Sequence, residues 1–212
     1  MHIPKTFEQN NIDELVSIIQ QYPFATLICS HAEGIDATHL PFIIEKNGED
    51  LVLLAHIAKA NPLWKAVQAG SDVLVVFNGP NCYVSPNHYP TKQQNGKAVP
   101  TWNYVVVHVK GSISFSNDPD WKYKVIDELT TVHEANSEIP WSISDAPDSF
   151  INNMLPAIVG VQITVNSIVG QWKLSQNQPR VNQEGVISGL SAIDNMASQS
   201  VADMARKQAT PK

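Results

Sequence analysis

The chain has 212 residues and a formal net charge of −6, with 14 Lys and Arg against 20 Asp and Glu. Because the basic residues are scattered, no patch could neutralise a run of phosphates, which argues against direct nucleic-acid binding. The chain has no apolar window approaching about 18 residues and no apolar leader at its start, so we expect a cytoplasmic protein that does not enter the membrane.

The first part of the chain is predicted to form a helix followed by three strands. Asn11, with Glu14 three positions later, is a helix N-cap pair, and Pro23 ends the apolar helical stripe that follows. Short apolar runs joined by turns then indicate an antiparallel meander. Cys29, and Cys82 further on, lie in such runs and are expected to be buried rather than paired or metal-bound. The elements expected here are a helix over residues 12–22 and strands over residues 24–30, 37–45 and 51–56.

The middle of the chain is predicted to contain a helix, two strands and a long loop. Asn61 is a capping residue followed by a proline, and Gly70 supplies the stop, so we expect a helix over residues 61–69 and strands over residues 73–77 and 82–85. The segment 83–104 is rich in proline, tyrosine and tryptophan. An ordered segment of this length without regular structure is usually functional. We interpret it as a binding loop, with a loop held down by its own aromatic side chains as the alternative.

The remaining sequence predicts a long strand and several helices. The strand is expected to bend at Gly111, and Asp118 with the following proline begins a helix that continues to about Ala135. The elements expected here are a strand over residues 102–115, helices over residues 119–135 and 148–155, a strand over residues 157–165 that resumes at 170–175, and helices beyond residue 177. The pattern is that of a mainly β fold, a closed or partly closed antiparallel barrel with peripheral helices. We expect a single domain over residues 1–212 with a C-terminal helical extension from about residue 178.

Familiar catalytic motifs are missing from the sequence. It contains no GxGxxG after a strand, no GxxxxGK[ST] and no GxSxG, so neither a dinucleotide site, a P-loop nor a hydrolase elbow is indicated. The seven histidines never fall in HxxxH or HxH spacing, and we therefore predict no metal site.

Three clusters besides the loop combine polar and charged groups. Residues 38–41 (THLP) place polar side chains in an apolar strand, and residues 56–62 (HIAKANP) place a lysine where a helix is expected to begin. A cation and free N–H groups at a helix start stabilise a phosphate. Residues 170–177 (GQWKLSQN) add an aromatic ring, a second cation and several hydrogen-bonding groups. Together they fit a flat, phosphorylated ligand such as FMN, although other nucleotides meet the same description.

The motifs in these clusters resemble those of the PaiB family. The words that carry the resemblance are HLPF (39–42), HIAKANPLW (56–64), YVSPNHYPTK (83–92), VPTWNY (99–104), HE (133–134), PW (140–141) and WKLSQN (172–177). That family is similar to the FMN-binding split-barrel proteins, which include pyridoxamine-phosphate oxidases and flavin reductases. The resemblance implies a six-stranded Greek-key split β-barrel, a homodimer, and FMN held at the dimer interface.

The resemblance also implies which residues contact FMN. Thr38, His39 and Leu40 would border the isoalloxazine, while Ala58, Lys59 and Asn61 would take the phosphate. The other residues implied in FMN binding are His56, Ser85, Trp102, Asn103, Lys173, Ser175 and Gln176, some of them contributed by the second subunit.

Two functions follow from this resemblance. One is an FMN-dependent oxidoreductase acting on a small molecule, in which His39, His56 or Tyr89 could donate a proton. The other is a flavin-dependent transcriptional regulator, which is the usual label of the family. A haem-binding or haem-degrading split barrel is a third possibility.

Overall fold

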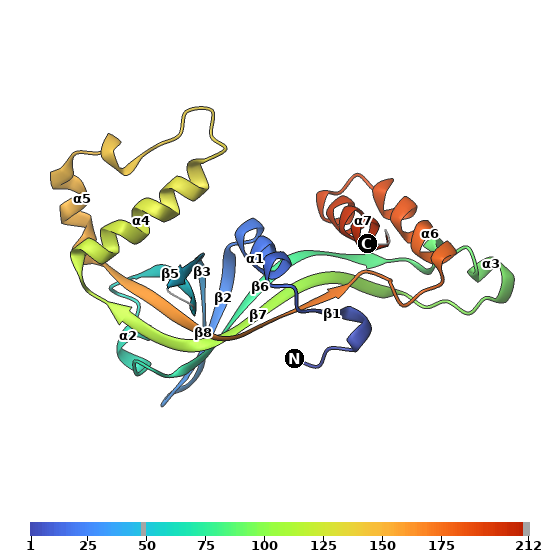
Figure 1. Ribbon diagram of the computed structural model, residues 1–212, viewed down its shortest axis with the longest axis horizontal. Helices are drawn as coiled ribbons and strands as arrows, with labels where there is room; N and C mark the ends of the chain where they lie inside the picture. The colour runs from blue at the N-terminus through green and yellow to red at the C-terminus, as the bar shows by residue number, and fades with distance from the viewer. Residues whose placement is uncertain (48–49, 210–212) are drawn as a thin grey trace. The chain divides into compact units, whose positions relative to one another are not determined.

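The computed structural model describes residues 1–47 and 50–209. In this part of the chain eight strands form one sheet, whose strand order is β3-β2-β6-β7-β8-β5-β4, with β1 paired to β8 (Figure 1). The strands are β1 (Glu8–Gln9), β2 (Phe24–His31), β3 (Gly34–Pro41), β4 (Ile43–Asn47), β5 (Asp50–Ala58), β6 (Asp72–Val84), β7 (Thr101–Ser116) and β8 (Ile158–Lys173). The prediction of a mainly β, split-barrel fold is confirmed.

Helices interrupt the sheet, and two of them begin at capping residues predicted from the sequence. Asn11 Oδ1 accepts the backbone N–H of Asp13 at 2.9 Å, and Asp118 Oδ1 accepts that of Trp121 at 2.7 Å, so both predicted N-caps are present. The α-helices are α1 (Ile12–Gln21), α2 (Leu63–Ala66), α3 (Lys92–Asn95), α4 (Pro119–Glu134), α5 (Asp148–Met154), α6 (Arg180–Ser191) and α7 (Met196–Ala209). Short 3-10 turns are η1 (Lys5–Phe7), η2 (Pro86–His88), η3 (Ile143–Asp145) and η4 (Leu155–Ala157). Within the described residues, no helix has the length and apolar run that a membrane crossing requires.

Contacts along the chain divide it into two units, and each is described separately. The barrel unit comprises Val16–Phe77 and His108–Ile168. The helix-pair unit comprises Met1–Leu15, Asn78–Val107 and the chain from Val169 onward. Strands β6, β7 and β8 contribute residues to both units. That the whole chain folds as a single domain stays a prediction.

The barrel unit curls its sheet until the two edges approach. Strands β2 and β3 form one antiparallel hairpin, and β4 and β5 form another. Although β3 and β4 stand at opposite ends of the strand order, only Phe42 separates them in sequence, and β3 contacts β5. Because one residue spans only about 3.8 Å, the edges must meet there.

Apolar side chains fill the barrel unit on both sides of the sheet. Leu27, Leu53 and Val75 are wholly buried. On the outer side, Leu54 of β5 packs with Val125 of α4 in a cluster that also contains Trp121. Burial of each such side chain contributes about 1.5–3 kcal/mol, so this packing fixes α4 against β5.

The helix-pair unit joins α6 and α7 to the ends of the long strands. Val186 and Leu190 of α6 and Val201 of α7 are fully buried, and α6 packs on α7 and on η2. Gly185 and Gly189 lie on α6 where residues 88–90 approach it closely. A Cβ on Gly189 would lie 2.0 Å from His88 Nδ1, and one on Gly185 would lie 2.3 Å from the His88 carbonyl oxygen. The glycines therefore permit this close packing.

Several predicted boundaries were wrong. The strand expected over residues 37–45 breaks at Phe42, whose N–H donates to the Pro23 carbonyl at 3.0 Å. Two expected pairs of strands are instead the continuous strands β6 and β8. The helix expected over residues 61–69 contains only α2, and the long loop is shortened by β6, η2, α3 and β7. The loop tip is a helical turn that ends at Gly96, whose φ is 66°.

Candidate functional site

The residues predicted to bind FMN fall into two groups. Those of the barrel unit are Thr38, His39, Leu40, His56, Ala58, Lys59 and Asn61, and those of the helix-pair unit are Ser85, Trp102, Asn103, Lys173, Ser175 and Gln176. The first group lies on two strands, β3 and β5, that contact each other, together with the connection that follows β5. The structure therefore brings β3, which carries Thr38, His39 and Leu40, into contact with β5, which carries His56.

On β3, the predicted residues point to two different faces. Leu40 is buried whereas His39 is exposed, and Thr38 shares the face of Leu40 because side chains alternate along a strand. His39 lies opposite Thr26 of β2, and its Nδ1 shares a hydrogen bond of 3.1 Å with Thr26 Oγ1. A ligand ring on one face of β3 can contact the side chains of Thr38 and Leu40, and a ring on the other face can contact that of His39. One ring cannot contact all three side chains.

His56 carries a buried atom that lacks a partner. It lies opposite Gly160 of β8, and a Cβ on Gly160 would lie 2.0 Å from the ring of Trp121, so Trp121 packs on the same face as His56. Among the described residues, nothing hydrogen-bonds the buried His56 Nδ1. Burial lowers the pKa of His56, so its ring is neutral near pH 7 and offers one donor and one acceptor. Such an orphaned buried atom indicates a missing partner, for which a ligand is one candidate.

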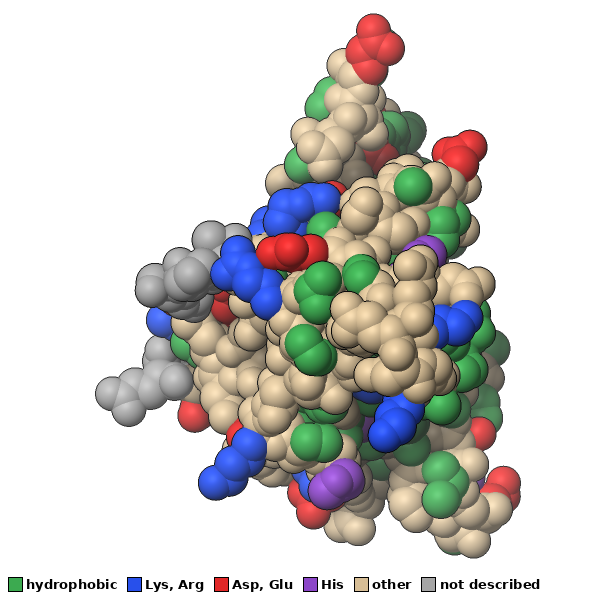
Figure 2. Space-filling model, turned by 90° about the vertical axis from the view of Figure 1, so that its right-hand side faces the viewer, with side chains coloured by type: hydrophobic (Ala, Val, Ile, Leu, Met, Phe, Trp, Pro, Cys, Tyr) green, Lys and Arg blue, Asp and Glu red, His purple; other side chains and the backbone are tan. Residues whose placement is uncertain are grey.

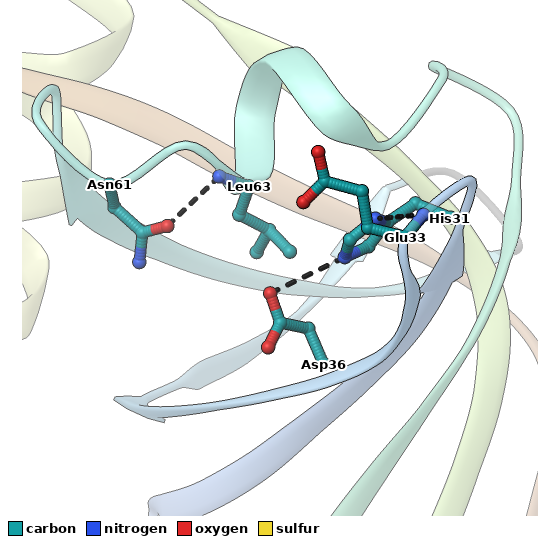
Figure 3. Close-up of polar contacts among 5 residues, drawn as sticks. All are labelled: His31, Glu33, Asp36, Asn61 and Leu63. Carbon is teal, nitrogen blue, oxygen red and sulfur yellow. Dashed lines mark hydrogen bonds and ion pairs between the residues drawn. The ribbon is translucent and has the colours of Figure 1, made fainter.

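The connection after β5 is held by its own backbone and side chains. The Lys59 N–H donates to the Ala157 carbonyl at 2.8 Å. Figure 3 shows Asn61 Oδ1 accepting the N–H of Leu63 at 2.9 Å. The helix that begins here, α2, has only four residues, and Asn61 already accepts its first N–H, so the helix dipole expected from a helix over residues 61–69 is much reduced. The exposed ammonium of Lys59 has no carboxylate partner among the described residues, so its charge is free for an anion.

Lys122 is a residue near Lys59 that the sequence reasoning missed. Its side chain is 4% exposed, and its ammonium donates to the carbonyl of Leu155 at 2.7 Å and to that of Ile158 at 3.4 Å. The pKa of Lys122 is lowered, first by burial and then by the charge of Lys59. Two cations therefore lie beside the turn formed by residues 155–158. No sequence signal distinguished Lys122 from the solvated lysines of α4.

In the helix-pair unit, several predicted residues line a cavity of about 240 Å³. Asn103 is fully buried, and its Nδ2 donates to Ser175 Oγ at 2.9 Å. The Tyr89 hydroxyl also lies near Ser175, and burial raises the pKa of Tyr89, so the phenol stays protonated. The residues that line the cavity are Tyr89, Lys97, Ala98, Val99, Pro100, Thr101, Asn103, Lys173, Ser175, Asn177, Gln178 and Asn182.

Lys173 places an ammonium group at the same cavity, where a hydrogen bond fixes its position. Its Nζ donates to Thr101 Oγ1 at 2.6 Å and lies 5.8 Å from the centroid of the Tyr104 ring. Burial lowers the pKa of Lys173. Gln176 does not line the cavity, because its side chain accepts the Leu174 N–H at 2.7 Å and stabilises the turn instead.

Trp102 and Ser85 lie outside this cavity. Trp102 is 54% exposed and packs edge-on against Tyr83, with ring centroids 6.2 Å apart. It neighbours Asn103 on β7, so its side chain projects from the opposite face. Ser85 Oγ accepts the N–H of Asn87 and caps η2. Of the lining residues that were not predicted, Thr101 stood in a motif of the resemblance, whereas Asn182 carried no signal at all.

The polar groups of the barrel unit fit FMN, and the observation that supports this fit is the buried Nδ1 of His56, which has no hydrogen-bond partner among the described residues. A neutral imidazole with a free ring nitrogen can meet a polar ring edge, and the free ammonium of Lys59 can meet a phosphate. The antiparallel split barrel and these groups define the class of flavin-binding split-barrel proteins.

Comparison with known proteins places the chain within this class. A family model described as "Putative FMN-binding domain" matches residues 1–167, and the chain belongs to that FMN-binding family. It is 31% identical to the "Protease synthase and sporulation protein PAI 2" of Bacillus subtilis, over 96% of each chain. It is also 32% identical to an uncharacterised protein of Emericella nidulans, over 100% of this chain and 99% of that one. The resemblance to the PaiB family is confirmed.

Solved structures support the fold. A conserved hypothetical protein from Mycobacterium tuberculosis matches with a TM-score of 0.58 and 12% identity, over 85% of this chain and 95% of that one. The FAD and haem binding protein from Mycobacterium smegmatis matches with a TM-score of 0.56 and 15% identity, over 78% of this chain and 73% of that one. At these identities the likeness concerns the fold alone.

Proposed function

We propose that the chain is a homodimeric, FMN-dependent oxidoreductase that acts on a small organic molecule. The observation that carries this proposal is the orphaned Nδ1 of His56, on a strand that contacts β3 and leads directly to the free cation of Lys59. Membership of an FMN-binding family supplies the cofactor.

Within the barrel unit, each group has a defined part in holding FMN. Lys59 neutralises the phosphate, with Ala58 and Asn61 beside it, while His56 offers its ring nitrogen to a polar edge of the ligand. Thr38 and Leu40 border the ring from one face of β3. When bound, FMN supplies the acceptance and donation of a hydride, and the protein supplies binding and orientation.

The second subunit is proposed to complete the pocket. Phe24 and Ile35 on the β2–β3 hairpin are 67% and 79% exposed, and exposed apolar side chains of this size gain from burial against another chain. Trp102 is likewise exposed and could stack on a flavin from a partner chain. The FMN contacts of Ser85, Asn103, Lys173, Ser175 and Gln176 stay predictions.

The oxidoreductase is tested by anaerobic reduction of the FMN-loaded protein with NADH or NADPH. Loss of the oxidised flavin absorbance, followed by its return when air is admitted, is expected. Protein-bound FMN that neither cofactor reduces, while dithionite does reduce it, would contradict a nicotinamide-linked oxidoreductase. Lys207→Met is a matched control, since Lys207 is exposed on α7, and it should reduce like the parent.

A transcriptional regulator is the second candidate, because the curated relative from Bacillus subtilis is named for protease synthesis and sporulation. The charge of −6 disfavours direct DNA contact. On the face drawn in Figure 2, lysine and arginine side chains lie dispersed among acidic, polar and apolar ones. Fluorescence anisotropy at about 0.15 M salt tests this candidate, and a clear preference for promoter DNA over random DNA would establish it.

Haem binding is the third candidate, because a structural neighbour is titled a FAD and haem binding protein. Among the histidines, the ring of His56 has a free buried nitrogen, whereas that of His39 is engaged by Thr26. A Soret band on haem addition that disappears in His56→Ala would support this candidate. An unchanged haem spectrum would remove it.

A further inference from the structure

The cavity around Ser175 has features of a ligand site that FMN binding does not account for. Its volume of about 240 Å³ is below the roughly 300 Å³ at which ordinary cofactor and drug sites begin, so a three-ring flavin does not fit inside it. The space therefore suits a small molecule better than a cofactor.

The backbone at the cavity is strained. Ser175 has a φ of 65°, and it is the only residue other than glycine with a positive φ among those the structure describes. A left-handed conformation costs a residue with a Cβ about 1–2 kcal/mol relative to the right-handed one. Such strain persists where surrounding interactions demand it, and it is concentrated at functional sites. Here it aims Ser175 Oγ at the fully buried Asn103.

The charged side chains that line the cavity are all positive. Lys173 and Lys97 line it, and no aspartate or glutamate does so among the described residues. Thr101 Oγ1 accepts a hydrogen bond from Lys173 and therefore directs its own hydroxyl proton elsewhere. A partly desolvated ammonium surrounded by hydroxyl and amide donors stabilises an anion more strongly than an exposed lysine does.

The other wall of the cavity is apolar. Ala98, Val99 and Pro100 line it, on the segment that leads into β7, and Val99 keeps 74% of its surface exposed, so this wall borders solvent. A ligand with one acidic head and a small apolar body would satisfy both walls, whereas a bare inorganic anion would leave the apolar wall without a contact.

We propose that this cavity binds a small organic carboxylate, with its acidic group at Lys173 and its apolar body against residues 98–100. The proposal concerns the helix-pair unit alone, and it assigns Asn103, Lys173 and Ser175 to the acid in place of the FMN contacts predicted for them. Asn103, Ser175 and Tyr89 form the polar floor beneath the acid, which explains why three polar side chains are buried together.

The test is isothermal titration of the full chain with benzoate at constant ionic strength. Benzyl alcohol is the neutral analogue and inorganic phosphate is the second anion. We expect benzoate to bind at least about tenfold more tightly than benzyl alcohol, and Lys173→Met to lose about that factor. Lys173→Arg should keep binding, and the control Lys207→Met should match the parent. Benzoate that binds no better than benzyl alcohol, or equally to Lys173→Met and Lys207→Met, would overturn the proposal.

A second variant and an FMN titration allow each outcome of the benzoate titration to be interpreted. If Lys173→Met does not fold by near-ultraviolet circular dichroism, Thr101→Val serves instead, since it keeps the ammonium but removes the hydroxyl that positions it. Unchanged benzoate binding in that variant would also count against the proposal, and binding of phosphate alone would refute the carboxylate. FMN is titrated into the same samples: FMN binding without benzoate binding removes only the acid site, and the reverse result removes only the proposed function.

Discussion

Ser175 combines a strained backbone with a hydroxyl that hydrogen-bonds the buried Asn103. Replacing it by alanine or by glycine removes the same hydrogen bonding with Asn103, but only glycine relieves the left-handed strain. We expect Ser175→Gly to be more stable to urea than Ser175→Ala by about 1 kcal/mol. Equal stability of the two variants would show that the strain at Ser175 carries no cost.

His56 makes the stability of the fold depend on pH. Its pKa is lowered in the folded state, so between that pKa and the ordinary histidine value the unfolded chain binds more protons. The free energy of unfolding should therefore fall as the pH is lowered from about 7.5 to about 5.5, through the ordinary histidine pKa of about 6.5.

Urea unfolding of His56→Gln at the same two pH values measures this contribution. The variant should lose less stability on acidification than the parent, and His2→Gln, which alters an exposed residue near the chain start, should behave like the parent. The pKa of His108 is also lowered by burial, so a smaller pH dependence remains in the variant. An identical slope in His56→Gln and the parent contradicts the assignment.

Individual site residues could be foreseen only where a local motif marked them. The motif around Lys59 led to an exposed cation, and the WKLSQN motif led to the partly desolvated Lys173 and the buried Ser175. The orphaned nitrogen of His56 and the buried ammonium of Lys122 could not be foreseen, because both depend on packing against α4 and β8. The helix predicted over residues 61–69 was wrong in length, since Asn61 caps a helix of only four residues, and the phosphate site at its start stays a prediction.

At the scale of elements, α6 shows two opposing effects at its glycines. Alanine is a better helix former than glycine by about 0.5–1 kcal/mol, but a Cβ at Gly185 would lie 2.3 Å from a backbone oxygen of His88. Overpacking of this kind costs about 1–3 kcal/mol and the backbone cannot move aside easily. We expect Gly185→Ala to be destabilised in urea unfolding. A stabilised Gly185→Ala would mean that α6 and residues 88–90 do not pack this closely.

Gly189 offers a matched comparison, because its close neighbour is the His88 ring rather than the backbone. Gly189→Ala should be destabilising in the parent but stabilising by about 0.5–1 kcal/mol in a His88→Ala background, where the helix propensity alone remains. The same sign in both backgrounds would contradict the packing described for α6.

Helix starts were predicted well because a cap is a local interaction. Asn11 and Asp118 each bond a backbone N–H two or three residues away, and that geometry is encoded in a few neighbouring residues. Strand boundaries depend on distant partners. The break at Phe42 follows from the meeting of β3 and β4, and the continuity of β6 past Gly79 follows from its close approach to Val105 of β7, neither of which is visible in the local pattern.

At the scale of the whole molecule, the account predicts an association of two chains. The exposed Phe24 and Ile35 are the candidates for the contact. Sedimentation equilibrium should give a mass near twice the 23.3 kDa of one chain, and Ile35→Asp should shift the mass toward one chain. A parent mass near 23.3 kDa at micromolar concentration would contradict the dimer.

The measurement that tests the central claim most directly is a titration of the purified chain with FMN, followed by quenching of flavin fluorescence and by the visible spectrum. The account predicts saturable binding with a dissociation constant in the micromolar range or below, weaker binding of riboflavin, and a loss of that preference in Lys59→Met but not in Lys207→Met. Flavin fluorescence that stays unchanged throughout the titration, in a protein that is colourless when purified, would contradict the claim that this chain holds FMN.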